Sequence, residues 1–379
     1  MKSIKYINVI LVFLIISGCI TQFIPETEEN QELLVVEGLI TDKPEVCKIK
    51  LSTSMRLGKK AVVKPLKGCT VFIEDDLSGM YLLKESQTPG VYVTEPADFQ
   101  GRVGHKYTLH INTNNSTSTH YSYQSLPMEM KAVPPIDSLY FERTLIADKE
   151  PGIPAKEGCQ IYLDTHDPSA KCKYYRWDYN ETWEFRLPFS VPVNKTCWIS
   201  NDAVVINIKN TNLMSEDIIN RFPLHFISNE TDRLKVKYSI LVNQYSLNED
   251  EFNYWNKLEN VIENVGTLYD VIPASVIGNI SCIEDPSEKV LGYFSVSAKA
   301  SVRMFIKEYF SGIVNKYSTC IEDTIFNNNP IPGLNVSVWI LEQSYPPEPP
   351  LKVITYQKGC ADCTVRGSLN KPEFWDDDK

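Results

Sequence analysis

Cysteines have the clearest chemical potential in this chain, and two of them have the spacing of a motif. Cys360-Ala361-Asp362-Cys363 has the Cys-x-x-Cys pattern of redox dithiols and of half a zinc site. No second pair at this spacing, no helical pattern and no neighbouring histidine accompanies it. We therefore expect disulfide bonds to two different elements, because two cysteines in an extended tail reach separate partners more readily than each other. Cys197 and Cys320 are the partners that we choose.

Histidines and acidic residues form neither a metal site nor a catalytic group in the sequence. His105 and His110 differ in parity, so that a single strand would point them to opposite faces. Asp75-Asp76 and His166-Asp167-Pro168 have the composition of turns. The chain also lacks a Gly-x-Ser-x-Gly elbow, a His-Glu-x-x-His pair and a phosphate-binding glycine loop. We expect no catalytic residue, no metal and no cofactor.

The N-terminus has the pattern of a lipoprotein signal peptide. Lys2 and Lys5 precede an apolar run that ends in Ile15-Ile16-Ser17-Gly18-Cys19. The run is shorter than the roughly 20 residues that cross a bilayer, so cleavage before the cysteine is favoured over a membrane-spanning anchor. We expect residues 1–18 to be a signal peptide and the Cys19 thiol to carry lipid.

The residues after the lipidated cysteine favour delivery to the outer membrane and to the cell surface. Position 20 is Ile instead of the Asp that retains lipoproteins in the inner membrane, and residues 19–31 form an acidic linker. More than one acyl chain, palmitate among them, would anchor the protein stably, because each buried methylene contributes about 0.8 kcal/mol.

Composition indicates an acidic globular protein. The chain has 379 residues, of which 43% are hydrophobic and 23% are charged, which is enough for more than one core. Loss of Lys2 and Lys5 with the signal peptide would change the formal net charge from −10 to −12. Because a basic surface is absent, we expect no nucleic-acid partner.

Short alternating strands are predicted over residues 32–130. Leu33–Thr41, Val46–Ser52 and four later segments alternate apolar and polar side chains between turns rich in Gly, Pro, Asp and Asn. This spacing predicts a β-sandwich of immunoglobulin-like or transthyretin-like type. Cys47 and Cys69 are the only cysteines of this region. Both lie at strand positions, and we expect them to pair.

A proline-stiffened segment near residue 135 predicts the boundary to a larger β-rich domain, residues 131–379, with one or two helices. Its longest strand candidate is Tyr174–Phe185, which has one aromatic and one polar face. We favour core packing over ligand stacking for Trp177 and Trp183. The aromatic face would carry Tyr175, Trp177, Tyr179 and Glu181.

The clearest helix candidate begins within Ser246–Glu251, which contains an N-cap candidate and an acidic first turn. Apolar residues then recur at helical spacing. Trp255 belongs to this apolar face, and we expect it in a core and not in a ligand site. Strand patterns return at Leu291–Ala298 and Val302–Ile306.

Two short patterns are typical of O-glycosylation in exported proteins of Bacteroidota. Asp137-Ser138-Leu139 and Asp323-Thr324-Ile325 each place an apolar residue after Asp and a hydroxyl residue. They make Ser138 and Thr324 candidate glycan acceptors.

Several segments spread over the chain together resemble one family. They are the N-terminal lipobox, Leu34–Asp42, Tyr174–Trp177, Glu181–Phe185, Gln244–Leu247, Gly278–Ile280, Leu291–Phe294, Cys360–Cys363 and Lys371–Trp375. On them the chain resembles, nearly end to end, the Bacteroidota lipoproteins that contain domain of unknown function 4249. The resemblance supplies no catalytic residues. Because such proteins are similar in setting to surface lipoproteins that accompany TonB-dependent transporters, it implies a capture or gating role.

The sequence therefore favours a non-enzymatic outer-membrane lipoprotein. It would bind membrane lipid through the acylated Cys19 and act in nutrient capture or as the accessory partner of a TonB-dependent transporter. A structural or adhesive module of the cell envelope is the alternative, and an enzyme ranks third.

Overall fold

A computed structural model describes most of the chain, and its described part is mainly β, as the alternating segments predict. The α-helix that it describes is α2 (Glu249–Glu263), where the sequence places its clearest helix. The described residues are 33–53, 64–95, 98–113, 121–147, 155–187, 194–203, 205–263, 276–307, 322–325, 339–343, 351–355 and 358–376.

The first β-sandwich has the strand order β17-β8-β7-β4-β5-β6-β2-β1-β18, with β3 beside β2 and β9 beside β7. The two halves of this sheet enclose one core, to which Val36 and Leu51 contribute from one half and Val71 and Ile111 from the other. The strands are β1 (Leu34–Ile40), β2 (Lys48–Thr53), β3 (Lys64–Pro65), β4 (Thr70–Asp75), β5 (Met80–Glu85), β6 (Val91–Val93), β7 (Lys106–Thr113), β8 (Tyr121–Ser125), β9 (Met128–Glu129), β17 (Ile280–Cys282) and β18 (Leu291–Val296).

Two strands of this sandwich come from far along the chain. β17 pairs with β8, and β18 pairs with β1 in parallel. The first sandwich therefore contains strands from both sides of the domain boundary expected near residue 131. A parallel partner for β1 has to arrive through a long crossover, and such a crossover leaves no local pattern.

The second β-sandwich consists of a three-stranded sheet, β10-β11-β15, and a five-stranded sheet, β13-β12-β16-β19, in which β14 also pairs with β12. Trp177 and Trp183 are 1% and 4% exposed, so both lie in its core, as expected. The strands are β10 (Ile136–Ile146), β11 (Lys156–His166), β12 (Tyr174–Arg186), β13 (Thr196–Asp202), β14 (Asn207–Asn210), β15 (Ile218–Ser228), β16 (Lys237–Ser246) and β19 (Lys299–Ile306).

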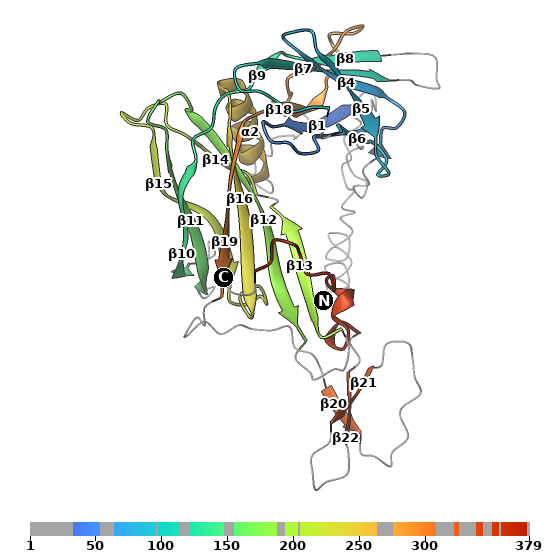
Figure 1. Cartoon of the computed structure of the whole chain (residues 1–379), viewed down its shortest axis with the longest axis vertical. Helices are drawn as coiled ribbons and strands as arrows, with labels where there is room; N and C mark the ends of the chain where they lie inside the picture. Colours follow the sequence, from blue (N-terminus) through green and yellow to red (C-terminus); the bar gives the residue numbers. More distant parts are fainter. Residues whose placement is uncertain are drawn as a thin grey trace, which may run out of the picture.

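Helix α2 lies where the two sandwiches meet (Figure 1). Its N-cap is Asn248, whose Oδ1 accepts a hydrogen bond from the Glu251 amide at 2.8 Å, so one of the unpaired first-turn donors is satisfied. Phe252 packs with Tyr174 of the second sandwich, and Tyr254 packs against the core of the first. The helix therefore contacts both sandwiches.

The C-terminal segment is tied to the edge strand β13. Trp198 and Ser368 exchange two backbone hydrogen bonds of 2.9 Å, and Cys363 is disulfide-bonded to Cys197. Cys360 is also disulfide-bonded, and Cys320 lies outside the described residues. The short helices η2 (Lys358–Cys360) and η3 (Cys363–Val365) flank these bonds, and β20 (Glu322–Ile325), β21 (Trp339–Gln343) and β22 (Leu351–Thr355) form a separate small sheet.

The expected bond between Cys47 and Cys69 is absent, and both residues are free thiols. Cys47 precedes the first residue of β2, whereas Leu66, just before Cys69, donates its amide to Leu51 near the other end of β2. The Cys47 amide donates to the Thr94 hydroxyl and the Cys69 amide to the Tyr92 hydroxyl, so the two cysteines are held by different contacts and no disulfide joins them.

Removal of the bond between Cys197 and Cys363 should destabilise the protein. The bond spans 166 residues of sequence, for which the chain-entropy model gives about 5 kcal/mol. We expect the double variant Cys197→Ala/Cys363→Ala to unfold at a clearly lower urea concentration than the wild type. The variant Cys69→Ala, which removes a free thiol, should lose less than about 1 kcal/mol. Equal midpoints for the double variant and the wild type would contradict the structural role.

Candidate functional site

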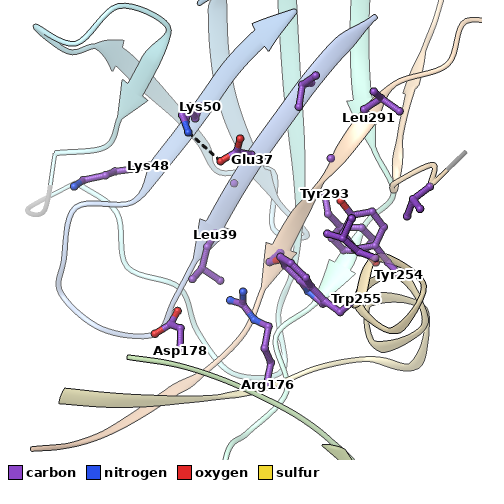
Figure 2. A pocket seen from close by; sticks show the side chains of 16 residues that line it. Glu37, Leu39, Lys48, Lys50, Arg176, Asp178, Tyr254, Trp255, Leu291 and Tyr293 are labelled. Carbon is purple, nitrogen blue, oxygen red and sulfur yellow. Dashed lines mark hydrogen bonds and ion pairs between the residues drawn. The ribbon is translucent and has the colours of Figure 1, made fainter. Parts of the chain in front are cut away.

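A cavity of about 640 Å³ lies between the first sandwich, helix α2 and the start of β12 (Figure 2). This volume is typical of a small-molecule site. Its walls are formed by the outer face of β1, β2 and β18, by α2, and by two side chains of β12. The lining residues are Val35, Glu37, Gly38, Leu39, Lys48, Lys50, Arg176, Asp178, Tyr254, Trp255, Leu258, Val276, Leu291, Gly292, Tyr293 and Ser295.

Strand alternation places the β1 side chains in the cavity. Val36 and Ile40 point into the core and are fully buried, whereas Val35, Glu37 and Leu39 point to the other face. A sheet with one face on its own core would normally expose the opposite face to water. Here α2 and β12 cover part of that face, and the cavity is the space left between them.

β18 completes the wall because two residues hold it against its neighbours. Gly292 has a φ of +86°, and a Cβ at this position would lie 2.0 Å from the Val36 carbonyl oxygen, so a side chain could not be accommodated. The Asn279 side chain donates to the Phe294 carbonyl and accepts from the Phe294 amide, both at 2.9 Å. These contacts position Tyr293 at the cavity.

Arg176 is the central cation of the cavity. Its guanidinium lies between two aromatic rings, with Cζ 4.8 Å from the centroid of Tyr245 and 4.7 Å from that of Trp255. Figure 2 shows the side chain extending from β12 into the cavity. Its Nε is buried and has no hydrogen-bond partner among the described residues. The Nε is therefore shielded from the cavity, but the half-buried side chain forms no ion pair among the described residues, so its other N–H groups remain for a partner there.

Two further polar groups lie beside this cation. Tyr293 is 6% exposed, and its hydroxyl has no hydrogen-bond partner among the described residues. Glu251 of α2 is completely buried. Burial raises the pKa of Glu251 above its usual range, and the neighbouring charge of Arg176 opposes this rise without cancelling it.

The remaining charged side chains of the cavity are partly paired. Lys50 and Glu37 form an ion pair of 3.2 Å at the rim. Asp178 accepts a hydrogen bond from Asn243 Nδ2 at 2.8 Å. The cavity is therefore lined by apolar and aromatic surface with a few placed charges, as small-molecule sites commonly are.

The acidic pairs of the sequence analysis are turn residues, as predicted. Asp75 accepts hydrogen bonds from the amides of Leu77 and Gly79. Asp167 accepts from the amides of Ser169, Lys171 and Cys172, which is the capping role of a turn aspartate.

The described histidines pair with separate carboxylates and do not converge. His105 contacts Asp76 at 2.9 Å, His110 contacts Glu74 at 2.9 Å, and His166 contacts Asp137 at 2.7 Å. Within the described ranges, no group of three or more potential ligands could hold a metal ion.

Other predicted sites lie on strands or outside the described residues. Ser138 is on β10, and its hydroxyl donates to Asp164 Oδ2 at 2.6 Å. Thr324 belongs to β20, of which only the backbone is described. Cys19 and the signal peptide precede the described residues.

Most of the cavity could not be predicted from the sequence. Arg176 lies on the face of β12 opposite the predicted aromatic face. Trp255 packs against a small buried cluster, as expected of a core residue, and it also lines the cavity. Tyr254 and Tyr293 were not singled out. The available signal was weak, because one arginine on the polar face of an aromatic strand also occurs in ordinary sheets.

A second polar cluster, around Glu181, lies within the second sandwich. Glu181 accepts hydrogen bonds of 3.0 Å from Arg233 and from Tyr238, and its carboxylate lies 3.4 Å from His225. Burial raises the pKa of Glu181, but His225 and Arg233 outweigh burial and hold it below its usual value. The carboxylate is paired with groups of its own sandwich, so the network is structural.

Fold and cavity together define a β protein of two sandwiches with a small-molecule-sized cavity at their junction. A model of the family described as domain of unknown function (DUF4249) matches residues 20–303, more than half of the chain. The chain therefore belongs to this family, and the matched span includes all lining residues of the cavity. A comparison with curated proteins gives no match.

The raised pKa of Glu251 predicts a pH dependence of stability. A carboxyl that holds its proton more tightly in the folded state favours folding at low pH, and this contribution is lost as pH rises through the folded-state pKa. As pH rises from the usual pKa of a glutamate carboxyl to the higher folded-state pKa of Glu251, the free energy of unfolding of the wild type should therefore fall by up to about 1.4 kcal/mol per pH unit.

The variant Glu251→Gln should lack this loss, because its side chain does not ionise. Urea unfolding from pH 4 to pH 8 measures the effect, and the exposed first-turn variant Glu249→Gln is the matched control. Parallel profiles for the wild type and Glu251→Gln would refute the assignment.

Proposed function

We propose that this protein is a non-enzymatic lipoprotein of the outer membrane of a Bacteroidota bacterium and that it captures a small ligand in the cavity at the junction of its sandwiches. The cavity itself is the observation that carries the proposal. It combines a ligand-sized volume, three aromatic side chains and a half-buried cation that forms no ion pair among the described residues. Protein interiors leave few voids of this size.

The location follows from the N-terminal sequence. Cys19 would carry the acyl chains that hold the protein on the membrane, and the acidic linker would present the folded part at the cell surface. Within the part of the chain that the structure describes, no helix is long and apolar enough to cross a membrane.

A structural or adhesive role is the second candidate. Leu77, Met80 and Leu82 are each about two-thirds exposed and follow one another around β5. Neighbouring exposed apolar side chains are a feature of protein contact surfaces. In the leading proposal the same exposed apolar surface would contact a transporter, so both the adhesive and the accessory role use it.

Filling the cavity should abolish ligand capture. Leu39 lines the cavity, and Leu39→Trp adds an indole to this space. The purified protein is incubated with an extract of growth medium and washed, and the retained small molecules are identified by mass spectrometry after denaturation. We expect compounds that the wild type and the exposed control Leu77→Trp retain and that Leu39→Trp does not. Identical retention by all three proteins, or none by the wild type, would argue against capture.

Association with a TonB-dependent transporter is the partner prediction. A lipid tether confines the protein to the plane of the transporter and so raises its effective concentration there. Cross-linking and pull-down of the tagged protein from outer membranes should recover such a transporter. Cys19→Ser, which cannot be acylated, should recover much less. Failure of the acylated protein to recover any transporter would count against the accessory role and favour the adhesive one.

A further inference from the structure

We infer that the ligand of the cavity is a small amphipathic monoanion, namely a carboxylate attached to a ring or another compact apolar body. This inference rests on the proposed capture function and adds the chemical class of the ligand. Three features support it: the geometry of the cation, the charge balance of the lining, and the shape of the apolar wall.

The cation is prepared for a planar anion. Tyr245 and Trp255 hold the guanidinium of Arg176 between their rings and leave its N–H groups to other partners. No described carboxylate forms an ion pair with Arg176, whose side chain is half-buried at the cavity. A carboxylate matches the guanidinium fork with two parallel hydrogen bonds, which a neutral amide cannot do with equal strength.

The charge balance favours a single negative charge. The lining contains three cations, Arg176, Lys48 and Lys50, and two carboxylates, Glu37 and Asp178. With the neighbouring Glu251 protonated, the net charge of plus one would be neutralised by one carboxylate. A phosphate dianion would exceed it and would also face both acidic side chains. This local positive charge contrasts with the net charge of −10 of the chain.

The apolar wall fits a ring. Tyr254 stands 4.8 Å from Tyr293 and 5.4 Å from Trp255, measured between ring centroids, so the three rings form one continuous surface. Val35 and Leu39 contribute aliphatic surface from β1.

Matched sets of acid, amide and amine probes test the inference. The probes are indole-3-acetate, indole-3-acetamide and tryptamine, with the corresponding phenyl and cyclohexyl compounds. Binding to the full-length protein in detergent is measured by saturation-transfer NMR and calorimetry. We expect the acids to bind at least about tenfold more tightly than their amides, and the amines to bind most weakly.

Variants at Arg176 locate this preference. Arg176→Gln should reduce the acid-to-amide ratio to near one, and Arg176→Lys should retain part of it, because it keeps the charge and loses the fork. Arg143→Gln, at an exposed site on β10 outside the cavity, should leave the ratio unchanged. Thermal unfolding of each variant shows whether it is folded. If Arg176→Gln does not fold, the acid-to-amide ratios of the wild type and of Arg176→Lys decide the inference.

The outcomes separate the two proposals. Equal binding of acids and amides by the wild type, with both abolished by Leu39→Trp, would overturn the monoanion inference and leave capture in the cavity intact. Binding of any class that Leu39→Trp does not affect would place it outside the cavity and contradict both. The absence of binding by every probe would overturn the inference, and the medium-extract experiment would then decide capture alone.

Discussion

The architecture depends on one passage of the chain, at which two residues lead from one sandwich into the other. β18 pairs with β1, and β19, which begins after only Ser297 and Ala298, pairs with β16. The Lys299 amide donates to Asp42 Oδ1 at 2.8 Å, and its ammonium pairs with Glu45. Because each residue of a connection spans at most about 3.6 Å, the end of β18 and the start of β19 must stay close together, so this passage holds the two sandwiches in contact.

The cavity is a consequence of that junction. Covering the outer face of β1 with α2 brings aromatic side chains from the helix and from β18 together, and it buries Glu251 beside Arg176. Neither sandwich would form this site alone, because one supplies the floor and the other supplies the central cation. A ligand bound there would touch both, and its binding would stabilise their observed arrangement.

Two polar clusters of this protein differ in a way that bears on function. The Glu181 carboxylate has its own partners, since it accepts hydrogen bonds from Arg233 and Tyr238 and lies 3.4 Å from His225. Arg176 forms no ion pair with a described carboxylate, and it lines an open cavity. Each cluster also holds a buried nitrogen without a hydrogen-bond partner among the described residues, His225 Nε2 in the first and Arg176 Nε in the second. The clusters therefore differ in the counter-ion, which the first contains and the second leaves to a ligand or water.

Local sequence determined the elements of this protein, and the tertiary structure decided the site. Alternation with period two predicted β1 and the aromatic face of β12, and capping with helical spacing predicted α2, because these signals depend on neighbours within a few residues. The pairing of β18 with β1, the separation of Cys47 from Cys69 and the stacking of Arg176 on Trp255 join residues far apart in the chain. Such contacts depend on how whole sheets pack, and no local period encodes them.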